Sequence, residues 1–191
     1  MKIAHPKNIL QNHSLEATLV VMLAFLSWQA PGFMTVDNFL NVLRNITMQG
    51  IIAFGMTMVI ISGEIDLSVG SAVALAACVV AVVTGKLSGL GEVASVSIGI
   101  VCALSVGALT GFISGKIREK SQVPTFITTL AFLTVLSGAA NLLTNGFPVL
   151  TFPEWYGFLG SGYIFGIPFA VYIFAIVFAA IYFLMDHTTL G

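Results

Sequence analysis

Two carboxylates, Glu64 and Asp66, lie between two long apolar runs, and their chemistry needs an explanation. Paired carboxylates can exchange protons or carry a coupling ion. Gly63 can end one helix just before them, and Asp66 can cap the next by accepting hydrogen bonds from its first amides. Alternatively, the break is buried among helices and lines a transport route. The residues expected to shape this break are Gly63, Asp66, Ser68 and Gly70.

Other catalytic constellations do not occur in the sequence. His5, His13 and His187 lie near the two ends of the chain, and no HExxH, GxSxG or GxxxxGK[ST] motif is present. Cys78 and Cys102 lie inside apolar runs without CxxC spacing, which favours two small core residues over a disulfide. The sequence therefore predicts neither an enzyme nor a cofactor or metal site.

A row of amides forms a second polar feature. Asn41, Asn45 and Gln49 recur every four residues, with Arg44 and Met48 beside them, so the amides share one helix face. Because amides are poorly solvated by lipid tails, we expect this face to point into a helix bundle. It can serve interhelical hydrogen bonding, or it can line the route of a neutral polyol. The sequence leaves both interpretations open.

The elements that position these residues follow from composition. Of the 191 residues, 58% are hydrophobic and 8% are charged, against about 25% charged in soluble domains. The net charge of −1 offers no surface for nucleic acid. We therefore predict an all-α integral membrane protein, a polytopic bundle of about six helices in the lipid bilayer. The expected spans are Leu15–Ala30, Ile46–Ser62, Leu67–Thr84, Val93–Ser114, Pro124–Leu143 and Tyr163–Met185.

Basic residues in short loops predict the orientation of these spans. The segment Lys116–Lys120 carries three positive charges in five residues and is expected to be a cytoplasmic loop. Counting back through four spans places the N-terminal tail, residues 1–14, in the cytoplasm too. Arg44 and Lys86 fall on the outer side against this rule. Glu64 is expected to face cytoplasmic water at a short turn.

An outer loop, Asn145–Gly162, is predicted between the last two spans. It is rich in aromatic residues and prolines, which suit the membrane interface. The loop is either a connector anchored at the interface or a docking surface for an extracytoplasmic partner.

Small residues recur every four positions on two of the expected helices. One row is Ala103, Gly107, Gly111 and Gly115, and the other is Ala77, Ala81 and Gly85. Such rows let helix backbones approach closely in a membrane. We therefore expect Gly107, Gly111 and Gly115 to be helix-packing residues without direct contact to a solute.

The run Gly55–Ser71 closely resembles the signature of the monosaccharide (ribose-type) permeases of bacterial ABC importers. Shorter segments resemble the same family in the same order: Gly32–Phe33, Asn38–Leu43, Val123–Leu130, Thr144–Pro148 and His187–Gly191. The resemblance covers essentially the whole chain. It implies that residues 15–191 are a transmembrane permease domain, the N-terminal portion of a longer permease that appears truncated at Gly191.

The resemblance also implies a function and partners. The chain would be a permease subunit, or a fragment of one, in the bacterial inner membrane. Two permease copies would form the pathway for a monosaccharide, a separate ATPase subunit would hydrolyse ATP, and a periplasmic sugar-binding protein would deliver the sugar. The alternatives are an ion-coupled secondary transporter, which needs acidic groups near the bilayer midplane, and a non-transporting assembly subunit.

Overall fold

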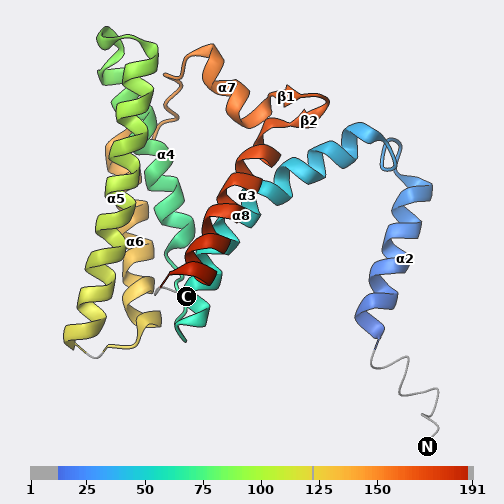
Figure 1. The fold of residues 1–191 in the computed structure, drawn as a ribbon, viewed down its shortest axis with the longest axis horizontal. Coiled ribbons are helices and arrows are strands. Elements are labelled where there is room, and N and C mark those ends of the chain that lie inside the picture. Colours follow the sequence, from blue (N-terminus) through green and yellow to red (C-terminus); the bar gives the residue numbers. More distant parts are fainter. Residues whose placement is uncertain (1–12, 122, 189–191) are drawn as a thin grey trace, which may run out of the picture. The chain divides into compact units, whose positions relative to one another are not determined.

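The computed structural model describes residues 13–121 and 123–188. In this part of the chain it has seven α-helices, one 3₁₀ helix and a two-stranded hairpin (Figure 1). The helices are α2 (Ser14–Gln29), α3 (Val36–Ile61), α4 (Val69–Lys86), α5 (Glu92–Ser121), α6 (Thr125–Thr144), α7 (Glu154–Ser161) and α8 (Phe169–His187). The shorter elements are η1 (Ser88–Leu90), β1 (Tyr163–Ile164) and β2 (Ile167–Pro168). The chain divides into two compact units, Met1–Asn45 and Ile46–Gly191.

Five helices are long and apolar enough to cross a membrane: α3, α4, α5, α6 and α8, of 18 to 30 residues. α2 is also apolar, but its 16 residues fall short of the roughly 17–25 that a spanning helix needs. The prediction of an all-α polytopic membrane protein is thus confirmed. Of the six expected spans, five reach spanning length within the described residues.

In the first unit, α3 begins earlier than predicted. The Thr35 hydroxyl accepts a hydrogen bond from the Asn38 amide at 3.3 Å and donates one to the Gly32 carbonyl at 2.6 Å. This contact satisfies one of the free amides of the first turn, so the helix starts at Val36. The predicted membrane span starts only at Ile46 because it was set by hydropathy, whereas the helix itself extends back through the amide row to Val36.

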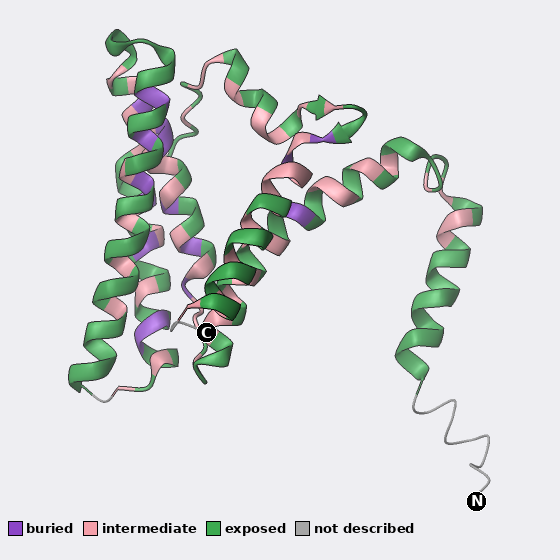
Figure 2. Ribbon diagram, viewed as in Figure 1, coloured by how far each residue is buried: buried purple, intermediate pink, exposed green. Residues whose placement is uncertain are grey.

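In the second unit, α4, α5 and α6 pack side by side and hold most of the buried residues (Figure 2). Leu75 of α4 and Leu136 and Ala140 of α6 form a buried apolar cluster, with half-buried Cys78 beside it. Both cysteines are free, as predicted. The polar break directly precedes α4, so this bundle fixes the position of its C-terminal end.

The approach of α5 to α4 occurs at Gly99. A Cβ added there would lie 3.0 Å from the Val80 carbonyl oxygen and 3.2 Å from Thr84 Oγ1. The neighbouring Val96 is only 1% exposed. The backbones of the two helices therefore meet at a glycine that the sequence analysis did not select.

The glycines selected from the sequence are placed differently. Gly107, Gly111 and Gly115 are all exposed, and an added Cβ at any of them would meet nothing within 4 Å. Ala103, in the same row, is buried. Within the described residues the three glycines thus pack against no other helix, and their role as packing residues stays a prediction.

α8 meets α3 through aromatic rings. Phe54 stacks on Phe174 with ring centroids 5.1 Å apart and contacts Phe178 at 5.6 Å. A Cβ added at Gly50 would lie 2.5 Å from the Phe174 ring, so this glycine makes room for it. Edge and offset contacts of this kind stabilise aromatic pairs beyond their buried area.

The segment between α6 and α8 is more ordered than the loop predicted there, since it contains α7 and the hairpin. Phe165 and Gly166 both have positive φ, which suits the tight turn of a two-residue hairpin. Pro168 then precedes the first residue of α8. The predicted helix start at Tyr163 is therefore wrong, because the hairpin occupies that stretch.

The same segment is pinned to α4. The Thr151 hydroxyl donates a hydrogen bond to the Ala81 carbonyl at 2.7 Å. The Thr151 side chain also fills the space beside Gly85, where an added Cβ would lie 2.9 Å away. Close by, the rings of Phe152 and Tyr156 stack with centroids 4.4 Å apart.

The predicted cytoplasmic loop is also helical, because α5 continues to Ser121. Lys116 and Glu119 form an ion pair at 2.8 Å across one helical turn. Basic residues in the last turn, Arg118 and Lys120, favour the negative end of the helix. Hydropathy ended the span at Ser114 because it does not register these contributions.

Candidate functional site

The break between α3 and α4, residues 62–68, begins with a defined helix end. The Glu64 amide donates to the Val59 carbonyl at 3.2 Å, and the Gly63 amide donates to the Ile60 carbonyl at 2.9 Å. Gly63 has φ +77°, so this is the paired Schellman pattern that ends many helices. The predicted role of Gly63 in ending the helix agrees with this geometry.

Replacing Gly63 with alanine is expected to lower the free energy of unfolding by about 1 kcal/mol, since a Cβ disfavours positive φ. Denaturation in mixed detergent micelles measures the change. Gly70→Ala is the matched control: Gly70 has no positive φ, and an added Cβ there would meet nothing within 4 Å. Equal losses in the two variants would contradict the assignment of strain to Gly63.

The start of α4 is organised by Asp66. Its Oδ1 accepts hydrogen bonds from the Ser68 amide at 2.7 Å and from the Ser68 hydroxyl at 2.6 Å. Ser68 itself occupies the N-cap position, and its carbonyl accepts from the Ser71 hydroxyl. Asp66 thus fixes the residue that precedes the helix and does not cap the helix directly, which corrects the predicted N-cap at Asp66.

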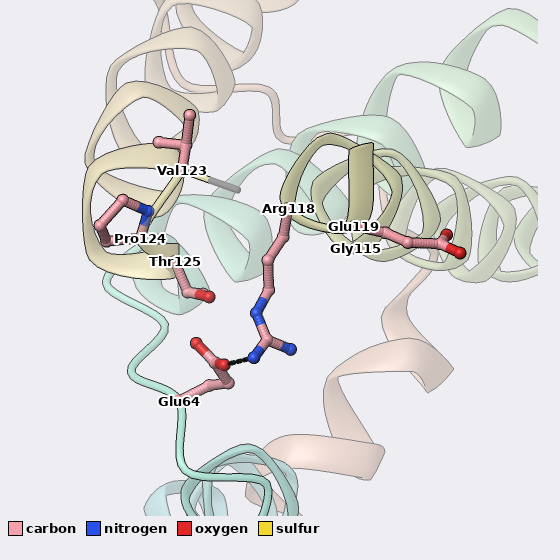
Figure 3. Close-up of a pocket in the computed structure, with 7 residues that line it drawn as sticks. All are labelled: Glu64, Gly115, Arg118, Glu119, Val123, Pro124 and Thr125. Atoms are coloured by element: carbon pink, nitrogen blue, oxygen red, sulfur yellow. Dashed lines mark ion pairs between the residues drawn. The ribbon is translucent and has the colours of Figure 1, made fainter. Parts of the chain in front are cut away.

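The sequence analysis expected Glu64 to face water. The structure instead pairs its carboxylate with Arg118 of α5 (Figure 3). The Glu64 side chain is 17% exposed and the Arg118 side chain is 51% exposed. The ion pairs His13–Glu16 and Lys116–Glu119 join neighbours along the chain. Glu64–Arg118 instead connects two elements far apart in sequence.

A hollow of about 520 Å³ surrounds this ion pair, lined by Glu64, Gly115, Arg118, Pro124 and Thr125 among others. Figure 3 shows the carboxylate and the guanidinium pointing toward each other across it, with the Thr125 side chain beside them. The Thr125 hydroxyl oxygen is buried and has no hydrogen-bond partner among the described residues. This end of the bundle is therefore polar and open.

A buried threonine of α6 also contacts the break. The Thr129 hydroxyl lies 3.4 Å from the Ile65 carbonyl oxygen, and Thr129 is only 1% exposed. Thr125 and Thr129 are four residues apart and therefore share one face of α6. Sequence reasoning selected neither threonine, although their spacing was a usable signal, and it treated Arg118 only as a marker of topology.

The amide row on α3 does not contribute to the lining of either hollow at the break. Asn41, Asn45 and Gln49 are all exposed, so no described helix covers them. The Arg44 guanidinium donates to the side-chain Oδ1 of Asn41 at 3.5 Å along the helix. Their role in lining a solute pathway stays a prediction.

Among the described residues, no group of three or more His, Cys, Asp or Glu could hold a metal ion.

These features define a class: a polytopic helical membrane protein with an ion-paired polar hollow at a helix break. Residues 38–191 match the family described as branched-chain amino acid transport system / permease component. The chain is 38% identical over 187 residues, 96% of its length, to the ribose import permease protein RbsC of Escherichia coli (strain K12). The chain therefore belongs to this permease family, among the ribose-type ABC permeases.

Two further relatives are permeases for other pentoses. The L-arabinose ABC transporter permease protein AraH of Azospirillum brasilense is 29% identical over 96% of this chain. The xylose transport system permease protein XylH of Escherichia coli (strain K12) is 34% identical over 72% of it. The chain spans 56% of the ribose permease, 52% of AraH and 34% of XylH. No solved structure matches the chain.

Proposed function

We propose that this chain forms part of the membrane pathway of a bacterial ABC importer that takes up a pentose. The observation that carries the proposal is its similarity, over almost its whole length, to a ribose import permease, together with matches to arabinose and xylose permeases. The five long apolar helices supply the membrane-spanning frame that such a pathway needs.

The partners follow from the class of transporter. A separate ATPase subunit supplies the energy on the cytoplasmic side, a periplasmic sugar-binding protein delivers the pentose, and a second permease copy completes the pathway. The chain is a non-enzymatic, multi-pass subunit of the inner membrane, with its N-terminus in the cytoplasm. The exposed amides Asn41, Asn45 and Gln49 then face the pathway, where uncharged donors and acceptors suit a neutral sugar.

The state of the acidic residues argues against an ion-coupled transporter. Glu64 is engaged by Arg118, and Asp66 accepts two hydrogen bonds from Ser68. A coupling carboxylate must be able to take up and release its ion, which these partners oppose. The family match likewise favours an ABC permease.

Uptake of radiolabelled ribose, arabinose, xylose and glucose tests the proposal in a strain that lacks the gene. Loss of uptake of one pentose, with glucose uptake unchanged, is the expected result, and the restored gene should recover it. Unchanged uptake of all three pentoses would contradict the proposed substrate class.

A further inference from the structure

The second unit contains two groups of helices that are held together by different kinds of contact. α4, α5 and α6 pack through a buried apolar core. α8 meets α3 through the rings of Phe54, Phe174 and Phe178. At the break, the contacts between the two groups are polar: the Glu64–Arg118 ion pair and the Thr129 hydroxyl on the Ile65 carbonyl.

The end of α3 and the adjacent face of α5 are separated by open space. A hollow of about 250 Å³ lies between Val59 of α3 and Ser62 of the break on one side and Gly111 and Ser114 of α5 on the other. An added Cβ at Gly111 would meet nothing within 4 Å. Side-chain packing therefore does not fix the separation of the two helices here, and the ion pair bridges the gap.

Such a bridge can open at modest cost. Half of the Arg118 side chain is already exposed, so water can solvate the guanidinium when it leaves Glu64. Gly63, next to Glu64, has positive φ and lies at a helix end, where domain motions commonly concentrate their backbone changes. By contrast, α4 and α6 share a buried apolar cluster, whose contacts would be lost if these helices separated.

We propose that Glu64 and Arg118 form a reversible clasp that holds the α3–α4 break against α5 and must open during each transport cycle. This inference rests on the proposed function, because alternating access requires one helix group to move against another. The two residues act as positioning groups and need not touch the sugar. The Thr129 hydroxyl, which lies 3.2 Å from the Phe126 carbonyl of its own helix and 3.4 Å from the Ile65 carbonyl, adds only a weak second contact at the break.

Charge variants supply the first test. Glu64→Gln and Arg118→Gln should each lose most of the pentose uptake of the complete transporter at unchanged protein abundance. The exchanged pair, Glu64→Arg with Arg118→Glu, should recover a substantial part of it. Lys116→Gln is the matched control. It removes the exposed ion pair between Lys116 and Glu119, which lies near Arg118 along α5, and should leave uptake unchanged.

Reversible cross-linking supplies the decisive test, because the protein folds before the clasp is locked. Cysteines replace Ser62 and Ser114, which line the hollow beside the ion pair, in a background carrying Cys78→Ala and Cys102→Ala, so that the Glu64–Arg118 pair itself is kept. The complete transporter is reconstituted in proteoliposomes with ATP enclosed and the sugar-binding protein outside. A bifunctional methanethiosulfonate reagent that spans the hollow then joins the two cysteines. Uptake should stop on cross-linking and return when a reductant is added.

Each outcome decides between the alternatives. Full transport by the cross-linked protein overturns the clasp, as does full transport by both single charge variants. Failure of the proposed function is distinguishable, since the unmodified protein would then transport no pentose at all. If the charge variants are less abundant in the membrane, their lower uptake does not test the clasp. Cross-linking then decides, because it is applied to protein that has already folded.

Discussion

Replacing Gly99 with valine should lower the free energy of unfolding by about 1–3 kcal/mol, the range found for overpacked interiors. Even a Cβ at this position would lie 3.0 Å from the Val80 carbonyl oxygen, and the two Cγ atoms of valine would extend further. Because the obstacle is backbone, a change of side-chain rotamer cannot relieve it. Denaturation in mixed detergent micelles measures the loss.

Gly107→Val is the matched control on the same helix. An added Cβ at Gly107 would meet nothing within 4 Å, and the intrinsic helix propensity changes equally in both variants. We therefore expect the difference between the two variants to report the α4–α5 contact alone. A loss at Gly107 as large as that at Gly99 would contradict the assignment of the helix contact to Gly99.

Replacing Asp66 with alanine should cost about 2 kcal/mol and reduce the amount of folded protein. The substitution removes the acceptor of both hydrogen bonds from Ser68, and bonds to a charged acceptor are stronger than neutral ones. Without these two hydrogen bonds, Ser68 is no longer held in place at the N-cap of α4. Unfolding in detergent and the protein level in membranes measure the effect.

Asp66→Asn separates geometry from charge. Its Oδ1 can accept the same two hydrogen bonds, so most of the stability should be retained. If asparagine were as damaging as alanine while the protein still folded, the negative charge itself would be required, and the hydrogen-bond account of Asp66 would fail.

The long apolar runs were predictable from the sequence because burial in lipid requires a continuous apolar stretch. α2, α4 and α6 accordingly begin and end within a few residues of the expected spans. The errors fall where polar contacts extend or replace a helix. The Thr35 cap lengthens α3, the Lys116–Glu119 pair lies in an extended α5, and a hairpin precedes α8.

The break itself was located by its residue types, since Gly63 and Asp66 have strong local preferences. Its long-range contacts were not predictable in the same way. Glu64 and Arg118 lie on different elements, and no local pattern indicates that a carboxylate at a turn will meet a guanidinium near the end of another helix. The partner of Glu64 is set by tertiary structure.

The row of glycines on α5 shows a related limit. Spacing predicts which residues share a face, but it does not identify what lies opposite that face. Gly99 meets α4, whereas Gly107, Gly111 and Gly115 face open space within the described residues.

The hydrogen bond from Thr151 to the Ala81 carbonyl makes α4 a link between two parts of the chain. The helix begins just after its N-cap Ser68, and near its other end the Ala81 carbonyl holds the segment that leads into α7. Its 18 residues make a strut about 27 Å long. α4 therefore links the aromatic segment around Phe152 and Tyr156 to the helix start that Asp66 organises.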